Sequence, residues 1–489
     1  MAERVSVLHW FRDDLRLHDN PALSAAVRGA APLVCLYVRG ETGPAVSPAG
    51  RPHSRPLGSA SRWWLAQSLR ALDAALGEHR QRLVLRSGEP VATIVATARE
   101  ARATRVHWNR GLGAACRALD RALIEALREA GIGATVHAPN LLAGPTPVTT
   151  KDGGPMRVFT PFWRRLRTLG PSRTPLAAPG KLARGPDLTG ERLADWALEP
   201  SRPDWAGGLR AAWTPGEDGA RQRLSDFLKQ AAGYAAERDR PDRAATSRLS
   251  PHLRFGEISA GEVFNAAQFM ADEGQVPGRD IDKFHSELGW RDFSYSLLQH
   301  NTDLAIKNLQ PRFDAFPWRD DAAGLRAWQR GRTGYPIVDA GMRELWTTGW
   351  MHNRVRMIVA SFLVKHLLID WRHGEQWFWD TLVDADPANN PASWQWVAGC
   401  GADAAPYFRI FNPVLQGRTF DPEGDYVRRW VPELGKLRDD DIHSPWLATP
   451  LDLADAGVTL GKNYPQPIVD HAAARARALE AFKATKSEI

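Results

Sequence analysis

The feature that most constrains this fold is a regular alternation of short apolar runs with helical patterns over residues 1–138. Five apolar runs are predicted as strands, at Val5–Trp10, Pro32–Val38, Leu83–Leu85, Val106–Trp108 and Ala134–His137. The segments between them are predicted as helices, at Pro21–Arg28, Ser61–Leu76, Val91–Arg102 and Cys116–Ala130. Such alternation implies a Rossmann-like α/β domain, in which helices cover both faces of a doubly wound parallel sheet.

The turn after the first predicted strand does not carry the glycine fingerprint of a dinucleotide-binding fold. The chain runs instead into FRDDLRLHDNPAL, residues 11–23, which has no glycine. Binding of a dinucleotide at this turn is therefore not supported, because the glycines are what allow the pyrophosphate to approach the backbone.

Two further parts follow the α/β domain. Residues 139–215 are rich in proline, glycine and isolated charges, and we interpret them as a connector with one anchored patch at Val158–Arg165. From residue 216 to 489 the patterns are helical with few strand signals, which predicts a larger all-α domain.

Composition narrows the class of protein. The net charge of +7 and the pI near 9.4 favour a polyanionic partner such as nucleic acid, although an arginine-rich proteome would give the same balance. The cysteines Cys35, Cys116 and Cys400 are too few and too far apart for a disulfide framework or a four-cysteine metal site. With no signal-peptide pattern and no apolar run of membrane-spanning length, we expect a soluble protein of the bacterial cytoplasm or nucleoid.

Two motifs in the second half combine chemically useful groups. TSRLSP, at Thr246–Pro251, places hydroxyl and N–H groups ahead of a helical stretch and could hold a phosphate, although an ordinary turn explains it as well. In ELGWRDF, a helix would place Glu287, Trp290 and Arg291 on one face. A carboxylate beside an aromatic ring can bind a base by its edge and its face, whereas the simpler alternative is a surface ion pair.

Two later motifs add an amide and paired carboxylates. On a helix, Asn353 and Met357 face the same way, so that they present an amide and a soft apolar group together. Asp384 and Asp386 precede Asn390, and the third and fourth ligands that a metal needs are not nearby, so no metal site is predicted. A carboxylate can instead hold an arginine, or accept from the N–H groups of a heterocycle.

Together these segments resemble the photolyase/cryptochrome family, and class I cyclobutane pyrimidine dimer photolyases in particular. The motifs occur in the order FRDDLRLHDNPAL (11–23), TSRLSP (246–251), ELGWRDF (287–293), TGYPIVDAGMRELWTTGWMHNRVRM (333–357), LIDWRHGE (368–375), NNPASWQWVAGCGADAAPYFRIFNP (389–413) and YPQPIVDH (464–471). The resemblance implies a blue-light-driven carbon–carbon lyase that repairs pyrimidine dimers by electron transfer from excited reduced FAD. A cryptochrome-type photoreceptor and a (6-4) photolyase are the alternatives.

The resemblance also implies roles for individual residues. Those expected to hold FAD are Tyr234, Thr246, Ser247, Arg248, Leu249, Ser250, Arg356, Asp384, Asp386 and Asn390. Those expected to line the substrate cavity are Glu287, Trp290, Asn353, Met357 and Trp396. The expected electron-transfer chain is Trp318, Trp371 and Trp394, and the expected phosphate contacts are Arg238, Arg291, Arg354 and Arg409.

Two of these positions discriminate among family members. Asn390 would lie near flavin N5, where photolyases usually have asparagine and many cryptochromes have aspartate or cysteine. Met357 stands where (6-4) photolyases have a histidine, so the imidazole proton donor of that chemistry is missing. Both residues favour repair of the cyclobutane lesion in UV-damaged DNA, by a protein that we expect to be a monomer.

The second chromophore of the family is less well matched. The family's motif after the fourth strand resembles WNRxYxPxxxxRD, whereas this chain has WNRGLGAACRALD at Trp108–Asp120. Small residues replace the aromatic residue and the proline, and Arg110 replaces the acid of folate-binding members. The resemblance therefore favours a deazaflavin, another flavin or no second chromophore over a folate, and the glycines and alanines would make room for a flat ring.

Overall fold

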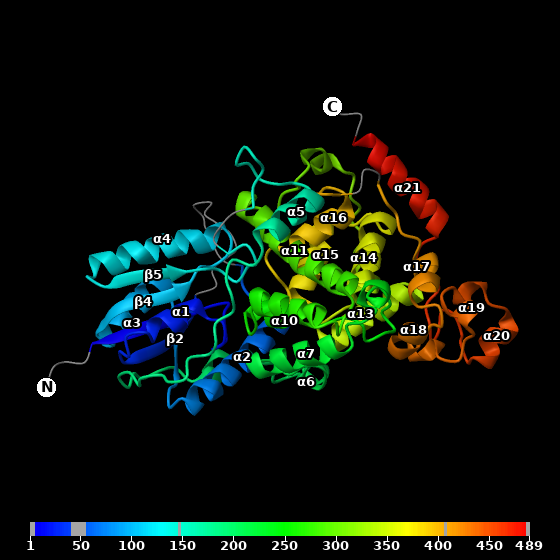
Figure 1. Cartoon of the computed structure of the whole chain (residues 1–489). Coiled ribbons are helices and arrows are strands. Elements are labelled where there is room, and N and C mark those ends of the chain that lie inside the picture. The colour runs from blue at the N-terminus through cyan, green and yellow to red at the C-terminus, as the bar shows by residue number, and fades with distance from the viewer. Residues whose placement is uncertain (1–4, 41–54, 145–147, 405–407, 486–489) are drawn as a thin grey trace. The chain divides into compact units, whose positions relative to one another are not determined.

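The computed structural model describes residues 5–40, 55–144, 148–404 and 408–485, and it divides into two compact units (Figure 1). Unit 1 comprises Met1–Ala232 and Ser247–Thr302, and unit 2 comprises Gly233–Thr246 and Asp303–Ile489. The boundaries predicted at residues 138 and 215 are boundaries along the sequence, and they stay a prediction.

Unit 1 contains a five-stranded, fully parallel sheet in the order β3-β2-β1-β4-β5. The strands are β1 (Ser6–Phe11), β2 (Leu33–Gly40), β3 (Leu83–Gly88), β4 (Ala103–Asn109) and β5 (Gly133–His137). All five match predicted strands, and the order is that of a doubly wound sheet, so the predicted α/β class is confirmed. β3 continues past Leu85 because Arg86 and Ser87 pair in register with β2, which apolarity alone does not reveal.

Four helices of unit 1 alternate with these strands (Figure 1). They are α1 (Pro21–Ala26), α2 (Ser59–Glu78), α3 (Pro90–Glu100) and α4 (Ala114–Glu129). Apolar side chains of the central strands, such as Leu8, Val34 and Val106, are buried with Ile94 of α3 and Leu123 of α4. The burial of these apolar side chains is what fixes the helices against the sheet.

The turn at residues 11–23 has a structural role. The buried Arg16 donates from Nη1 to the carbonyl of Gly256, 2.8 Å away, and from Nη2 to that of Asp19, at 2.7 Å. The side chain of Asn20 accepts from the N–H of Leu23 and caps α1. Gly256 has a φ of +66° and approaches the backbone of Asp13 so closely that a Cβ atom would collide with it. The motif therefore joins the sheet to a later helical segment of the same unit.

The other helices of unit 1 come from residues 139–302 and begin within the predicted connector. They are α5 (Phe159–Leu169), the 3₁₀ turn η1 (Leu193–Trp196), α6 (Gly207–Ala212), α7 (Glu217–Lys229), α9 (Ser250–Phe255), α10 (Ala260–Asp272) and α11 (Gly278–His300). The buried carboxylate of Glu257 accepts from Trp64 Nε1 at 3.0 Å and from Ser68 Oγ, and it lies 2.5 Å from His252 Nδ1. This network binds α9 to α2 without leaving the carboxylate unpaired.

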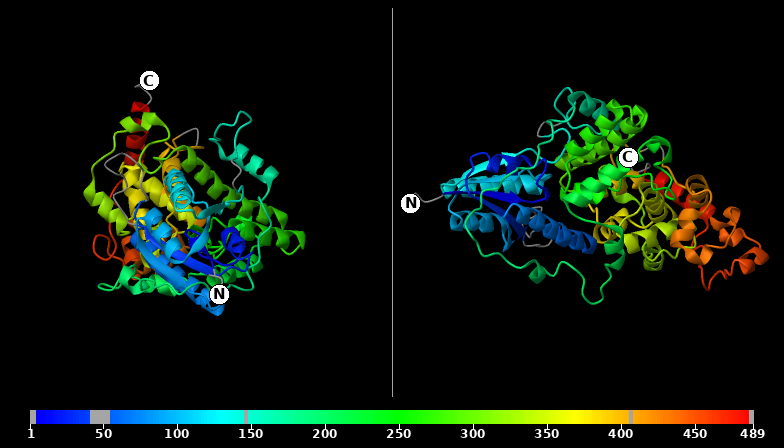
Figure 2. Two further views of the ribbon diagram at one scale, coloured as in Figure 1. Left: turned by 90° about the vertical axis from the view of Figure 1, so that its left-hand side faces the viewer. Right: turned by 60° about the horizontal axis from the view of Figure 1, so that its bottom comes forward.

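Among its described residues, unit 2 contains helices and connecting segments and no strand of a sheet, as the sequence predicted for this part of the chain. Its helices and turns are α8 (Tyr234–Glu237), η2 (Pro311–Ala315), α12 (Ala322–Gln329), α13 (Pro336–Thr348), α14 (Asn353–Ser361), η3 (Phe362–His366), α15 (Trp371–Thr381), α16 (Asn389–Ala398), α17 (Pro413–Phe420), α18 (Asp425–Trp430), η4 (Pro432–Leu434), α19 (Asp439–Ile442), η5 (Pro445–Leu447), α20 (Pro450–Asp455) and α21 (His471–Ala484). Helices α17 to α20 gather in one cluster, coloured orange in Figures 1 and 2. The core lies among α13, α14, α15 and α16, and most of their apolar residues are buried there.

No helix within the described ranges has both the length and the apolar character that crossing a bilayer requires.

Stability is expected to fall steeply as the pH drops from 6.5 toward 4. Burial lowers the pKa of His9 and His366 to about 3, and that of His107, His285 and His352 to about 4. The unfolded chain takes up protons near pH 6.5 and the folded chain does not, so each histidine costs about 1.4 kcal/mol per pH unit below that value. Thermal unfolding at pH 7.5, 6 and 5 measures the slope.

A variant with His9→Gln provides the control for this prediction. It removes one of the buried groups that take up a proton only on unfolding, so its Tm should fall less with pH than that of the wild type. A Tm that is the same at pH 7.5 and pH 5 for both proteins would contradict the assignment.

Candidate functional site

The predicted site residues are divided between the two units. Unit 1 contains Ser247, Arg248, Leu249, Ser250, Glu287, Trp290 and Arg291. Unit 2 contains Tyr234, Arg238, Thr246, Trp318, Asn353, Arg354, Arg356, Met357, Trp371, Asp384, Asp386, Asn390, Trp394, Trp396 and Arg409. Each group is described within its own unit.

An ion pair anchors the polar part of the site in unit 2. Arg356, on α14, donates from Nη1 and Nη2 to the two oxygens of Asp384, at 3.1 and 2.8 Å. Its Nε donates to the carbonyl of Met351, 2.8 Å away, so the guanidinium is held on both edges. The side chain of Asp384 is only 4% exposed, and a carboxylate so placed depends on its arginine partner. The structure therefore brings Arg356 and Asp384 together, and their role at a flavin stays a prediction.

Asp386 and Asn390 lie at the start of α16. Asp386 Oδ1 accepts from the N–H groups of Ala388 and Asn389, at 2.8 and 2.7 Å, which satisfies backbone donors at the helix end. Asn390 Nδ2 donates to Glu375 of α15, to Oε1 at 2.8 Å and to the carbonyl at 3.0 Å. Because Glu375 binds the amide nitrogen of Asn390, Oδ1 points away from Glu375. It can accept a hydrogen bond from an N–H group of a ligand.

Glu375 was missed by the sequence-based prediction, and it is buried at 2% exposure. Its only sequence signal is its place in LIDWRHGE, 15 residues before Asn390. The interaction depends on the packing of α15 against α16, which a pattern along the chain does not report.

One face of α14 presents the remaining predicted contacts of unit 2. Asn353 is the first residue of the helix and is exposed, and Met357 is partly exposed one turn later. His352, before them, caps the helix through its side chain, which accepts from the N–H of Arg354. An amide and a thioether are thus available on the surface of unit 2 next to the Arg356–Asp384 pair.

Glu287 and Trp290 lie on α11 in unit 1. Lys283 Nζ contacts Glu287 Oε1 at 3.1 Å, and the Glu287 side chain is 29% exposed. The ring of Trp290 stacks on Phe159 of α5, with centroids 3.7 Å apart and planes at 8°. Phe159 stacks in turn with Trp163, 6.4 Å away at 6°. Trp290 is therefore the end member of a three-ring stack that holds it in one orientation.

A basic face on α5 lies beside this stack. Arg164 and Arg165 are exposed, and neither forms an ion pair with a carboxylate among the residues that the structure describes. The sequence signal for this face was VFTPFWRR, which we had interpreted only as an anchored patch of the connector. Exposed arginines next to a stacking aromatic are typical of surfaces that bind nucleic acid.

The predicted phosphate loop contains residues with different roles. Leu249 is 1% exposed, so its side chain packs in the core and only its backbone could contact a ligand. Arg248 adopts a positive φ of 51°, and its guanidinium lies over the ring of Trp213 at 4.4 Å. Ser247 Oγ accepts from the N–H of Leu249 at 3.4 Å, and Ser250 begins α9. In unit 2, Tyr234 is buried beneath the guanidinium of Arg238, 5.6 Å away.

The three tryptophans of the predicted electron-transfer chain share one core in unit 2. Trp394 is 2% exposed and Trp371 is fully buried, whereas Trp318 is only partly buried. Trp371 Nε1 donates to Asn308 Oδ1 at 2.9 Å, while Trp394 Nε1 has no hydrogen-bond partner among the described residues. The order of burial suits a path from the interior to the surface, and the roles themselves stay a prediction. Trp396 is partly exposed and donates to the carbonyl of Asp403 at 3.0 Å.

The four predicted phosphate contacts differ in accessibility. Arg409 is exposed, and Arg354 is partly exposed and paired with Asp239 at 2.6 Å. Arg238 is 8% exposed. Arg291 donates to the carbonyl of Asn140 at 2.8 Å and is 11% exposed. We therefore expect Arg409 to contribute more to DNA affinity than Arg291, whose guanidinium already serves the fold.

The motif at Trp108–Asp120 has a more structural role than expected. Trp108 is fully buried in the sheet and donates to Asp120 Oδ1 at 3.0 Å. A Cβ atom at Gly111 would lie 2.6 Å from the Arg12 guanidinium and 2.7 Å from the side chain of Cys116, so this glycine permits close packing. The room for a flat ring that the sequence suggests at these small residues stays a prediction.

A cavity of about 280 Å³ nevertheless lies next to this motif in unit 1. Arg110 and Arg117 line it, together with Asp292 and Gln299 of α11. Burial raises the pKa of Asp292 to about 6, and its Oδ2 accepts from the N–H groups of Leu142 and Ala143. The cavity therefore combines apolar walls with a few polar groups, as small-molecule sites do.

Comparisons with known proteins identify both halves of the chain. Residues 7–180 match the family model described as DNA photolyase, and residues 284–484 match that of the FAD binding domain of DNA photolyase. The chain is 51% identical to the deoxyribodipyrimidine photo-lyase of Agrobacterium fabrum, over 98% of each chain. It is 38% identical to cryptochrome-1 of Arabidopsis thaliana, over 97% of this chain and 69% of that one.

A solved structure agrees with these sequence matches. The crystal structure of a class III photolyase from Agrobacterium tumefaciens superposes with a TM-score of 0.94 at 50% identity, covering 100% of this chain and 99% of that one. The motifs had suggested class I, so the class within the family stays a prediction.

Proposed function

The chain belongs to the photolyase/cryptochrome family, and from this premise we propose that it repairs cyclobutane pyrimidine dimers in UV-damaged DNA, with FAD and blue light. Its reaction is that of a deoxyribodipyrimidine photo-lyase, which cleaves carbon–carbon bonds. The observation that carries the proposal is α14, which offers Asn353 and Met357 on its accessible side and holds Asp384 through Arg356.

The residues of unit 2 fit a flavin by their chemistry. A flavin ring presents N–H donors and carbonyl acceptors along its edge. This part of the site offers the Arg356–Asp384 pair, Asp386 and the Oδ1 atom of Asn390, which Glu375 orients. Bound FAD supplies the light-driven electron transfer of the reaction. Glu375 and Arg356 hold the polar side chains in place, so that no reorganisation is needed when the cofactor binds.

The proposed lesion follows from Met357. A thioether cannot donate a proton, so this position provides apolar contact to a dimer and no acid catalysis. Glu287, on α11, would bind the polar edge of the dimer, and Trp290 would pack on its face. The lesion leaves the duplex at a reduced cost because its pairing and stacking are already weakened.

The decisive experiment is repair of a dimer-containing oligonucleotide by the reduced, FAD-loaded protein under blue light. We expect light-dependent loss of dimers, and its absence would overturn the proposed function. Glu287→Ala and Met357→Ala should each lower the repair quantum yield severalfold, because each removes a contact to the dimer. Glu273→Ala, an exposed glutamate at the end of α10, is the matched control and should repair like the wild type.

A cryptochrome-type photoreceptor is the second candidate, since cryptochrome-1 is 38% identical over almost the whole chain. That function predicts a light response of the flavin without loss of dimers in the same assay. A third outcome, repair of the (6-4) photoproduct alone, would show that Met357 does not select the lesion.

The cavity beside Trp108–Asp120 is our proposed place for a second chromophore, if the protein carries one. A deazaflavin or another flavin suits its arginines and its buried carboxylate, and Arg110 stands where folate-binding relatives have an acid. The absorption spectrum of the purified protein identifies each of these compounds by its own bands. We expect the protein to bind DNA as a monomer.

A further inference from the structure

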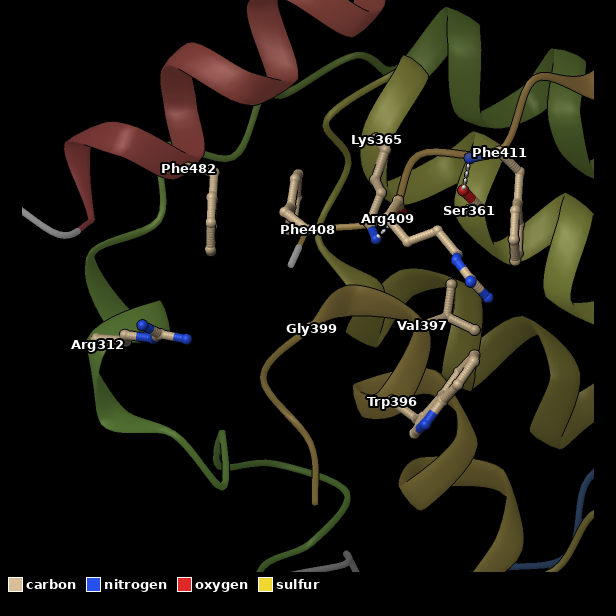
Figure 3. Close-up of a pocket in the computed structure, with 10 residues that line it drawn as sticks. All are labelled: Arg312, Ser361, Lys365, Trp396, Val397, Gly399, Phe408, Arg409, Phe411 and Phe482. Atoms are coloured by element: carbon tan, nitrogen blue, oxygen red, sulfur yellow. Dashed lines mark hydrogen bonds between the residues drawn. The ribbon is translucent and has the colours of Figure 1, made fainter. Parts of the chain in front are cut away.

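The buried amine of Lys365 has no part in the site described above. Lys365 belongs to η3, the π-helical turn that follows α14, and it is 3% exposed. Its Nζ donates to the carbonyl of Arg409, 2.5 Å away, and lies 4.2 Å from the centre of the Phe408 ring (Figure 3). The amine thus contacts the main chain of Arg409, whose side chain is exposed.

The segment Phe408–Phe411 is held at both ends (Figure 3). The ring of Phe408 stacks on Phe482 of α21, with centroids 4.5 Å apart and planes at 7°. The N–H of Phe411 donates to Ser361 Oγ at 3.4 Å, and both phenylalanines are 9% exposed. Between them, the side chain of Arg409 is directed outward alongside the Phe411 ring, 5.9 Å from its centre. The bond from Lys365 holds the main-chain carbonyl of Arg409, the residue that bears this side chain.

Stability does not explain a lysine at this position. Burial lowers the pKa of Lys365 to about 7, whereas in the unfolded chain the amine is protonated up to about pH 10.4. Folding therefore costs stability at every pH below about 10.4, because the folded chain either loses this proton or, below about pH 7, keeps a buried charge. No carboxylate forms an ion pair with Lys365 in the described part of the chain.

The groups around the amine do not offset this cost. Two titratable groups act on the charge of this amine: the Arg409 guanidinium disfavours it and the Cys400 thiol favours it. Arg312 of η2 lines the same small cavity, and His366 follows Lys365 on η3. Elements α16 and α21 contribute only uncharged residues to that cavity, namely Trp396, Val397 and Phe482. Burial of an apolar side chain here would cost less free energy than burial of an amine.

We propose that Lys365 is a positioning residue for DNA binding, which holds the backbone at Arg409 so that the exposed guanidinium is presented to a DNA phosphate. The proposal rests on the proposed function, since it requires that the protein bind DNA. A charge-assisted hydrogen bond from an ammonium is shorter and stronger than a neutral one. Lys365 therefore holds the Arg409 carbonyl most firmly below about pH 7.

The test is the affinity of the FAD-loaded Lys365→Met protein for dimer-containing duplex DNA in the dark. We expect Kd to rise about fivefold at pH 6.5, about the contribution of one phosphate contact, and the slope of log K against log salt to fall by about 0.9. Arg409→Ala should give the same change, and the double variant should be no weaker than either single one, because both changes remove one contact. Lys462→Met removes an exposed lysine of unit 2 and controls for net charge.

Two further readouts separate positioning from a structural role. The Tm of Lys365→Met should be unchanged or higher, whereas a structural residue would lower it. The wild-type Kd should rise between pH 6.5 and 8.5 more than that of Lys365→Met, because only the wild type loses an ammonium. Wild-type affinity and salt slope in Lys365→Met, or additive effects in the double variant, would overturn the proposal. If no protein binds the DNA at any salt, the proposed function fails first.

Discussion

Asp384→Ala protein is expected to be purified with less than about one tenth of the wild-type FAD content. The substitution leaves Arg356 without the two oxygens that it now contacts at 3.1 and 2.8 Å. Removing one partner of a buried ion pair costs about 3–5 kcal/mol, and the lower part of this range applies because the Arg356 side chain is 24% exposed. The guanidinium can then turn away from its present position, and the flavin would lose the two partners that we propose for its ring edge.

The flavin-to-protein absorbance ratio after purification measures this effect. Asp384→Asn keeps the shape and one acceptor, so it should retain more flavin than the alanine variant. Asp303→Ala, which removes an exposed carboxylate paired with Lys307, is the control and should retain all of it. Full flavin content in Asp384→Ala would show that the pair with Arg356 serves only the fold.

Trp318→Phe is expected to lower the rate of light-driven flavin reduction at least about tenfold. The substitution removes the tryptophan that we propose for the surface end of the electron path. Trp318 is the most accessible of the three tryptophans, and its ring lies 4.3 Å from that of Phe316, so a phenylalanine fits the same place. Repair of dimers should be unchanged when the flavin is first reduced chemically, because that assay does not use the path.

Photoreduction of the oxidised protein in the presence of an external reductant measures the rate. Trp430→Phe changes another partly buried tryptophan that packs against the same core, and it should photoreduce like the wild type. Loss of both photoreduction and repair in Trp318→Phe would mean that the residue is structural.

Local pattern determined much of what could be predicted. Apolar runs such as those around Leu8 and Val34 read as strands because a strand buried on both faces must be apolar throughout, and parallel strands need crossover helices. The helical spacing of Asn353 and Met357 was reliable for the same reason, since residues one turn apart share a face. The family motifs then indicated FAD and DNA, and the comparisons confirmed the family.

Contacts between distant segments could not be predicted in this way. Nothing along the chain indicates that the Arg12 guanidinium packs against Gly111 and excludes a side chain there. Leu249 belongs to a motif implied to hold phosphate, yet its side chain lies in the core. In both cases the sequence gives the residue type but does not indicate which residues pack around it.

The periodicity of the elements and the chemical groups available on each could be predicted from the chain alone, because both follow from residues close together along it. Which of those groups meet depends on how the helices pack. Asn390 is oriented by Glu375 across two helices, and the carbonyl of Arg409 is held by Lys365, 44 residues earlier. A hydrogen bond requires its two atoms within about 3 Å, and residues so far apart along the chain reach that distance only when the helices that carry them pack together.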